Sequence, residues 1–210
     1  MKKALVLGGS GLIGQQVIAQ LLQKENYSVT VLVRTALPMQ HNRLIQVIVD
    51  FENINKEAIM ADEIFCCLGT TSKLAGSKQA FYKVDFEYVL ELATIGHLNG
   101  AKKFALVSSM GANEKSAVFY NKTKGAIEQA VASIGYETLF IFRPSLLLGK
   151  RKEFRLGERI AQFIFTSLSI LLPKKYRAIQ AKQVAKAMIT CMDGTDSGII
   201  VLESDKIADL

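Results

Sequence analysis

The chain has 210 residues, of which 50% are hydrophobic and 21% are charged, and its formal net charge is +7. This length fits one α/β domain better than two, and the apolar content excludes an intrinsically disordered chain. The excess of basic residues suits an anionic partner such as a phosphorylated cofactor, a nucleic acid or a membrane surface. The sequence contains no long Lys/Arg run and no zinc-ligand spacing. It therefore does not favour nucleic acid as a partner, and we assign no metal site.

The cysteines and the start of the chain bear on the cellular compartment. Cys66, Cys67 and Cys191 are odd in number and two of them are adjacent, which is not a disulfide framework and predicts thiols in a reducing compartment. Lys2 and Lys3 precede an apolar run that is too short for a signal peptide. No apolar stretch is long enough to cross a bilayer. These features together predict a cytoplasmic protein.

Short apolar runs alternate with longer segments of helical spacing along the chain. The short runs predict strands at Ala4–Leu7, Ser28–Val33, Leu44–Val49, Glu63–Leu68, Phe104–Val107, Thr138–Phe142 and Ile199–Leu202. The longer segments predict helices at Leu12–Gln23, Gln79–Leu98, Ala117–Ser133, Arg155–Leu172 and Ala181–Met192. Apolar runs of this kind are typical of parallel strands that are buried on both faces. The alternation predicts a doubly wound, mostly parallel α/β sheet.

A glycine-rich turn follows the first predicted strand. Gly8, Gly11 and Gly14 have the spacing G-x-x-G-x-x-G. In such a turn the first glycine makes the tight bend, the second lets backbone approach a pyrophosphate, and the third lets the helix pack closely. The start of the helix then offers free N–H groups to the phosphates. We therefore expect a Rossmann fold that binds a nicotinamide dinucleotide; the alternative is a structural turn without a ligand. The residues expected at this turn are Gly8, Ser10, Gly11, Leu12, Ile13 and Gly14.

The ends of the next strands extend the expected cofactor site. Arg34 follows the second strand, where an acidic residue would select NAD and an arginine suits the 2′-phosphate of NADP. We therefore expect NADP (NADPH) in preference to NAD, while a solvated surface arginine is the alternative. Asp50 and Phe51 should lie near the adenine. The segment Leu68, Gly69 and Thr70 should border the middle of the cofactor, because ligands lie at the carboxyl ends of parallel strands.

A serine pair, a tyrosine and a lysine follow in the order that carbonyl chemistry needs. Ser109 ends the fifth strand, and Tyr120 and Lys124 lie one turn apart on the next helix. A nearby ammonium favours the phenolate and lowers the pKa of a tyrosine, so Tyr120 is the candidate general acid/base. Ser109 would position a carbonyl oxygen, and Lys124 would also hold the nicotinamide ribose. Alone, this tyrosine–lysine spacing also fits a solvated helix face.

These motifs together resemble the short-chain dehydrogenase/reductase family over about residues 1–150. The residues that carry the resemblance are Gly8-x-x-Gly11-x-x-Gly14, Ser108-Ser109, Tyr120-x-x-x-Lys124 and Arg143-Pro144-Ser145. Finer motifs are similar to a small atypical group, the Tat-interacting-protein-like oxidoreductases, and they are Cys67-Leu68-Gly69-Thr70-Thr71, Val84-Asp85-Phe86-Glu87-Tyr88, Ser108-Ser109-x-Gly111-Ala112 and Phe142-Arg143-Pro144.

The resemblance implies NADPH binding and a Ser–Tyr–Lys triad on a Rossmann fold. Cofactor contacts are also expected from Ser108, Tyr120, Lys124, Arg143, Pro144 and Ser145. Many members of the wider family carry an asparagine where this chain has Asp85, which places their four-residue proton relay in doubt here. Between the two adjacent serines we prefer Ser109 as the catalytic one, as is usual in the family.

We expect one domain over residues 1–210, with a small helical substrate-pocket or lid region at 151–198. The apolar stretch at 160–172 lies between basic clusters and fits a substrate lid, a dimer or peripheral membrane contact, or an ordinary core helix.

Three functions remain in competition. The leading one is an NADPH-dependent oxidoreductase that acts on a small carbonyl compound. A second is a non-catalytic NADPH-sensing protein. Sugar-nucleotide epimerisation is a third, against which Arg34 and the short carboxy-terminal region argue.

Overall fold

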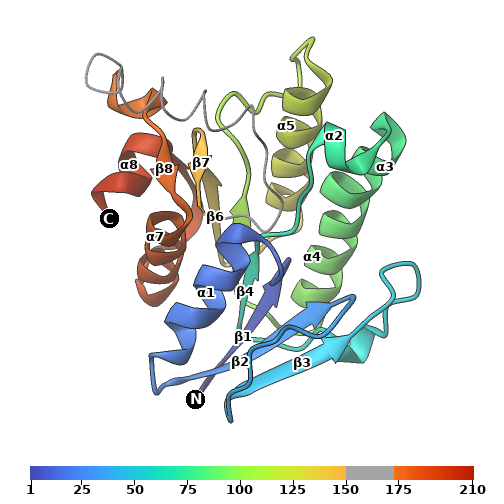
Figure 1. Cartoon of the computed structure of the whole chain (residues 1–210), viewed down its shortest axis with the longest axis vertical. Helices are drawn as coiled ribbons and strands as arrows, with labels where there is room; N and C mark the ends of the chain where they lie inside the picture. Colours follow the sequence, from blue (N-terminus) through green and yellow to red (C-terminus); the bar gives the residue numbers. More distant parts are fainter. Residues whose placement is uncertain (150–172) are drawn as a thin grey trace.

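A computed structural model of the chain describes residues 1–149 and 173–210. Within them, a seven-stranded parallel sheet has the order β3-β2-β1-β4-β5-β6-β9. Its strands are β1 (Lys2–Leu7), β2 (Tyr27–Val33), β3 (Leu44–Ile48), β4 (Glu63–Cys66), β5 (Lys103–Val107), β6 (Thr138–Arg143) and β9 (Gly198–Glu203). The prediction of a doubly wound, mostly parallel α/β sheet is confirmed (Figure 1). Its strand order reverses between β1 and β4, where ligands bind in folds of this kind.

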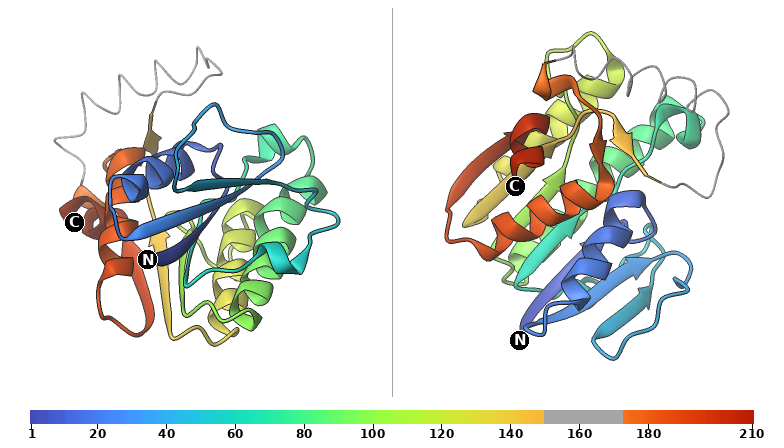
Figure 2. Two further views of the ribbon diagram at one scale, coloured as in Figure 1. Left: turned by 90° about the horizontal axis from the view of Figure 1, so that it is seen from below. Right: turned by 60° about the vertical axis from the view of Figure 1, so that its left-hand side comes forward.

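Helices cover both faces of the sheet. On one face α1 (Leu12–Leu22) packs beside α7 (Ala181–Asp193), and α8 (Ser204–Asp209) joins them (Figures 1 and 2). On the other face lie α3 (Lys78–Tyr82), α4 (Tyr88–Leu98) and α5 (Phe119–Ala132). Each layer has its own apolar core, because the inward-facing strand residues alternate between the two faces.

The two edge strands differ from the prediction of burial on both faces. Ile45 and Ile48 of β3 are exposed, and so are Ile199 and Val201 of β9. The central strands are buried as predicted, since β4 and most of β1 have helices on both sides. The prediction was wrong at the edges because a local apolar run does not reveal which strand ends up outermost.

The helix predicted over residues 79–98 is interrupted. A π-helical turn, η2 (Lys83–Glu87), separates α3 from α4. π-Helical turns are rare and often occur at functional sites. Here the wide turn carries Asp85, which is fully buried.

Several short elements were not predicted. They are η1 (Lys56–Ala58), α2 (Ser72–Ala75), β7 (Leu147–Leu148), η3 (Lys174–Tyr176), β8 (Ile179–Gln180) and the C-terminal helix α8. The helix predicted at 155–172 and the contact surface predicted at 160–172 lie outside the described residues. Among the residues that are described, none of the helices has the length and apolar character needed to span a bilayer.

Candidate active site

The glycine turn and the loop after β4 meet at the carboxyl edge of the sheet, where the loop after β5 also lies. Gly8 follows β1, and its φ of 77° lies in the region that favours glycine. A Cβ on Gly8 would lie 2.5 Å from the carbonyl oxygen of Cys67, which directly follows β4. The two loops are therefore in backbone contact at the point where the strand order reverses.

The other two glycines bring α1 close to this turn. A Cβ on Gly14 would lie 2.3 Å from the carbonyl oxygen of Gly8, so only glycine allows this helix to pack so tightly. Gly11 is the N-terminal residue that caps α1, and no side chain caps the N–H groups there. Ser10 is exposed beside them. This arrangement has the form of an anion-binding helix start, with Leu12 half-buried and Ile13 buried behind it.

The residues expected around the adenosine lie after β2 and β3. Arg34 is exposed directly after β2. The carboxylate of Asp50 accepts a hydrogen bond from the backbone N–H of Glu52 at 3.0 Å, which stabilises the turn after β3. Phe51 packs against Tyr88 with ring centroids 5.5 Å apart. Phe51 therefore offers a half-buried aromatic surface near the edge where Arg34 lies.

Lys124 and Asp85 form a buried ion pair inside the expected site. The Lys124 Nζ lies 2.8 Å from Asp85 Oδ1, and the two side chains are 6% and 0% exposed. The other carboxylate oxygen of Asp85 accepts a hydrogen bond of 2.7 Å from the backbone N–H of Thr70. Asp85 thus joins η2, α5 and the loop after β4. The substitution that the sequence marks as a departure from the family is an ion-pair partner of the lysine.

Burial and charge act in opposite directions on Lys124. Burial disfavours the ammonium, but the Asp85 carboxylate outweighs it, so the pKa of Lys124 is raised and the side chain stays charged. Tyr120 acts on the same ammonium electrostatically. The neighbouring thiol stays neutral, because burial raises the pKa of Cys66 to about 12. Tyr120 itself is half-buried, with its ring 5.4 Å from that of Phe81.

The serine pair lies at the end of β5 and offers two hydroxyl groups. The Oγ atoms of Ser108 and Ser109 are buried, and neither has a hydrogen-bond partner among the described residues. Buried polar groups are normally paired. Two buried hydroxyls without a partner among the described residues therefore fit a site that holds a polar ligand.

The last residue of β6 and the two residues after it contact other elements of the fold. The Arg143 guanidinium pairs with Glu128 of α5 and, at 3.2 Å, with Glu203 of β9. Ser145 donates to the backbone carbonyl of Arg177 and accepts from the Ser204 hydroxyl at 2.9 Å. The Pro144 carbonyl accepts a hydrogen bond from the backbone N–H of Met110 at 3.0 Å. These contacts give Arg143, Pro144 and Ser145 structural partners, so their expected role at the cofactor stays a prediction.

Sequence reasoning missed Glu128 and the pairing of Asp85. Glu128 lies four residues after Lys124 and therefore on the same helix side, a spacing that offered a signal. No local signal joined Asp85 to Lys124, which are far apart in the chain.

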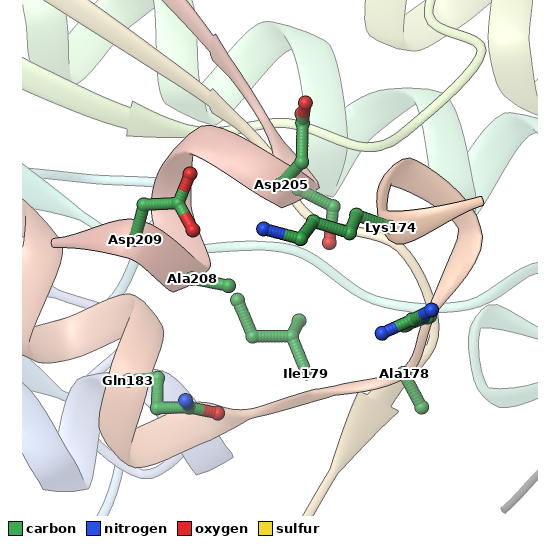
Figure 3. A pocket seen from close by; sticks show the side chains of 9 residues that line it. Lys174, Ala178, Ile179, Gln183, Asp205, Ala208 and Asp209 are labelled. Carbon is green, nitrogen blue, oxygen red and sulfur yellow. The ribbon is translucent and has the colours of Figure 1, made fainter. Parts of the chain in front are cut away.

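A cavity of about 230 Å³ lies between η3, α7 and α8, and its lining includes Arg177 and Ser204, which hydrogen-bond Ser145 (Figure 3). Lys174 extends from η3 toward α8 across it. Its lining mixes basic and acidic side chains, including Lys174, Arg177, Asp205 and Asp209. It does not contain the expected catalytic residues.

Comparison with known proteins identifies the family. Residues 8–194 match a family model described as NAD(P)H-binding. The chain is 34% identical to the protein HTATIP2 of Rattus norvegicus over 98% of its own length and 87% of the relative's. It is also 32% identical to the mitochondrial protein FMP52 of Candida albicans, over 96% of this chain and 91% of that one. The expectation of a cytoplasmic protein is contradicted, since the FMP52 relatives are named mitochondrial.

Solved structures show the same fold. MoeE5 in complex with UDP-glucose and NAD matches with a TM-score of 0.74 and 16% identity, over 95% of this chain and 75% of that one. UDP-glucuronic acid 4-epimerase from Bacillus cereus in complex with NAD matches with a TM-score of 0.72 and 14% identity, over 99% and 80%. At such identities the likeness concerns the fold alone. From its sequence relatives and its sheet, the chain belongs to the NAD(P)H-binding Rossmann proteins, in an atypical branch similar to the short-chain dehydrogenases/reductases.

Proposed function

We propose that this protein binds NADPH along the carboxyl edge of the sheet and reduces a small carbonyl compound. The observation that carries the proposal is the pair of buried serine hydroxyls at the end of β5, which have no hydrogen-bond partner among the described residues and are followed along the chain by Tyr120 and the charged, buried Lys124 of α5. Buried hydroxyls that serve only the fold are normally hydrogen-bonded within the protein.

The residues of the first turn fit the dinucleotide. Gly8 leaves no room for a side chain between the turn and the loop after β4, and Gly14 leaves none between the turn and α1. The uncapped helix start would point its N–H groups at the pyrophosphate. Arg34 would pair with the 2′-phosphate, which is the reason for preferring NADPH to NADH. Gly69 would let the cofactor lie against the loop after β4, where Leu68 and Thr70 flank it.

Each side chain then has a role at the carbonyl group. The bound nicotinamide supplies a hydride to the carbonyl carbon. Tyr120 donates the proton of its Oη to the carbonyl oxygen, and Ser109 hydrogen-bonds that oxygen and fixes its position. Lys124 holds the ribose of the cofactor. Ser108, deeper at the end of β5, would support the placement of Ser109.

The direct test combines a binding assay with a turnover assay. Fluorescence titration should show NADPH binding to the wild type, and a panel of aldehydes and ketones should reveal NADPH consumption. Tyr120→Phe should retain NADPH binding but lose about 10²-fold or more of turnover, because it lacks the transferable proton. Tyr176→Phe is a matched control, since Tyr176 is exposed on η3. Full turnover by Tyr120→Phe would contradict the assigned acid, and a wild type without affinity for NADPH or NADH would contradict the whole proposal.

A second candidate is an NADPH-dependent binding protein without catalysis. The observation that favours it is the ion pair of Asp85 with Lys124, which occupies the lysine that the triad needs. In that case NADPH should change the recovery of partner proteins in pull-down experiments, and Tyr120→Phe should leave this recovery unaltered. Equal recovery with and without NADPH would count against a sensor.

A further inference from the structure

The outermost strand β9 has a backbone partner on one side alone within the described part of the chain. It pairs with β6, and it forms the outer edge of the sheet (Figure 2). The backbone N–H of Gly198 donates to the carbonyl oxygen of Glu137 at 2.9 Å, so Gly198 faces inward. Alternate residues of a strand turn their N–H and C=O groups to opposite sides. The N–H and C=O groups of Ile199 and Val201 therefore face outward.

The side chains of the same two residues are also open. Ile199 is 56% exposed and Val201 is 45% exposed, while Ile200 and Leu202 pack against the core on the side of α7. Proteins that keep an edge strand free usually place a lysine, a proline or a bulge on it. Gly198–Leu202 contains no charged residue and no proline, and its register with β6 is unbroken. This edge therefore favours pairing with a further strand.

The opposite edge strand, β3, is less open. The side chain of Gln46 accepts a hydrogen bond from the backbone N–H of Leu37 at 2.7 Å and donates one to the Met39 carbonyl at 2.7 Å. The segment before β3 thus folds back against its own strand. Pairing of β9 with β3 of another copy would also add chains without end. The β3 edge is for both reasons a poor partner for β9.

A second copy of β9 fits this edge. Antiparallel pairing about a two-fold axis at Ile200 places Ile199 of each copy opposite Val201 of the other. Their outward N–H and C=O groups then exchange hydrogen bonds, as directly opposed residues do in antiparallel sheets. An axis at Val201 would instead place Ile199 opposite Glu203, and an axis at Ile199 would place Val201 opposite Ser197. The register at Ile200 is the one that joins apolar to apolar side chains on both sides of the axis.

We infer that β9 is a dimer interface, at which two copies of this chain pair antiparallel about Ile200 and join their sheets into one. Such an interface uses the same surface on both copies and closes at two. Because the joined strands run in opposite directions, the carboxyl edges of the two sheets face opposite ways. Each candidate site is then formed by its own chain, and the dimer does not depend on the proposed function.

The test measures the mass of the protein in solution without any cofactor. Sedimentation velocity or light scattering of the wild type at micromolar concentrations should give twice the 23.1 kDa of one chain. Val201→Lys puts an ammonium on the edge and should give a monomer, with a dissociation constant raised by about tenfold or more. Its fold should persist, because Val201 is already 45% exposed. Ile48→Lys makes the same change at a 58% exposed position of β3 and should leave the dimer intact.

A cysteine at the axis tests the register. In the inferred pairing, residue 200 faces its own copy in a non-hydrogen-bonded pair with Cα atoms about 4.5 Å apart, which a disulfide can bridge. With an added oxidant, Ile200→Cys should therefore form a covalent dimer. Ile199→Cys should not, because its position faces Val201, and the wild type with its three native cysteines gives the background.

The outcomes decide for or against the interface. A wild type that stays monomeric would overturn it, and so would assemblies larger than two, which β9 pairing cannot form. A Val201→Lys variant that stays dimeric, or a monomeric Ile48→Lys, would also overturn it. If Val201→Lys does not fold, the mass of the wild type and the Ile200→Cys link still decide. Failure to bind NADPH would remove the proposed function and leave this test unaffected.

Discussion

At the residue scale, Gly14 and Gly11 make different contributions to the first turn. The extra methyl of Gly14→Ala would lie 2.3 Å from the Gly8 carbonyl oxygen, so backbone must shift. We expect a loss of about 1–3 kcal/mol in the free energy of unfolding, as for other overpacked sites, together with weaker NADPH binding. Gly11→Ala brings its methyl to 3.2 Å from the same oxygen with an ordinary φ of −77°. It should alter stability little and weaken mainly NADPH binding. Urea unfolding and fluorescence titration of both variants test this contrast, which fails if the two lose equal stability.

Arg34 is the residue that should distinguish the two coenzymes. Replacing it in Arg34→Ser removes the charge that would meet the 2′-phosphate. A charge-assisted hydrogen bond contributes about 1.5–3 kcal/mol, which corresponds to roughly a 10- to 100-fold loss of NADPH affinity. NADH affinity should be unchanged, because NADH has no phosphate at this position. Thr35→Ala, at the exposed neighbouring position, is the control. Equal losses for both coenzymes would show that Arg34 serves the fold and not selectivity.

At the scale of elements, Arg143 links β6 to α5 and β9. Its partner Glu128 has a side chain that is 3% exposed. Removing one partner of a buried pair leaves the other charge uncompensated and typically costs about 3–5 kcal/mol. Because Arg143 is 25% exposed and keeps Glu203 at 3.2 Å, we expect Glu128→Ala to cost less, about 2–3 kcal/mol. Thermal and urea unfolding measure the loss; a change below about 0.5 kcal/mol, typical of surface positions, would mean that the link is not structural.

A second cluster of polar and charged side chains lies at the amino ends of the strands β2 and β4. The hydroxyl of Tyr27 lies 2.7 Å from Glu63 and 2.8 Å from Asp193, at the end of α7, and Lys24 pairs with Asp193 at 2.9 Å. Partial burial opposes ionisation of Asp193, but hydrogen bonds from Lys24 and Tyr27 outweigh it and lower the pKa of this carboxyl.

The ionisation of Asp193 makes the stability of the fold sensitive to acid. A carboxyl whose pKa is lowered by folding binds its proton more readily in the unfolded chain. Its stabilisation is therefore complete above the ordinary aspartate range, near about pH 4, and is lost as the pH falls below it. Tyr27→Phe should reduce the free energy of unfolding by about 1–3 kcal/mol at neutral pH, because it removes the hydroxyl that donates to the buried Glu63 Oε2. It should also reduce the acid-dependent part of the loss in urea unfolding measured from pH 7 to pH 3. An unaltered pH dependence would rule out the role of the hydroxyl.

At the scale of the whole molecule, bound cofactor should stabilise the fold, because the unfolded chain cannot bind it. NADPH at 100 times its Kd adds about 2.7 kcal/mol. For a domain of this size that corresponds to a rise in Tm of about 5–10 °C. Thermal scans with NADPH, NADH and free adenosine should give the largest rise with NADPH. A Tm that does not respond to any of them would exclude tight binding by the native protein.

The sequence predicted the central fold because apolar runs and helical spacing are local properties. The first strand, the glycine turn and α1 could be placed in this way. The edges could not, since Ile45 and Ile199 lie in apolar runs like those of the buried strands but are exposed for lack of a neighbour. The two-residue strands at Leu147 and Ile179 are too short for any periodicity.

The candidate site was predicted less completely than the fold. Tyr120 and Lys124 stand at a spacing that a helix brings onto one side, so a motif could single them out. The pairing of Asp85 with Lys124 joins residues from two helical segments and depends on tertiary packing. The π turn that carries Asp85 could not be read from the local hydrophobic spacing. The buried positions 81, 85 and 89 are four residues apart, which is close to the 3.6 residues per turn of an α-helix.

That wider coil has a consequence for how this protein can change over evolutionary time. A π-helical turn holds one residue more than the α-helical winding that it replaces, so the wide turn lets α3 and α4 keep their buried faces in register. Losing a single codon there would favour a regular α-helix that keeps Phe81 and Val89 on the buried face and removes only the wide turn around Asp85. Such a deletion should therefore disturb the pairing of Asp85 with Lys124 more than the apolar core, whereas substitutions at the outward-facing residues of the turn should spare both.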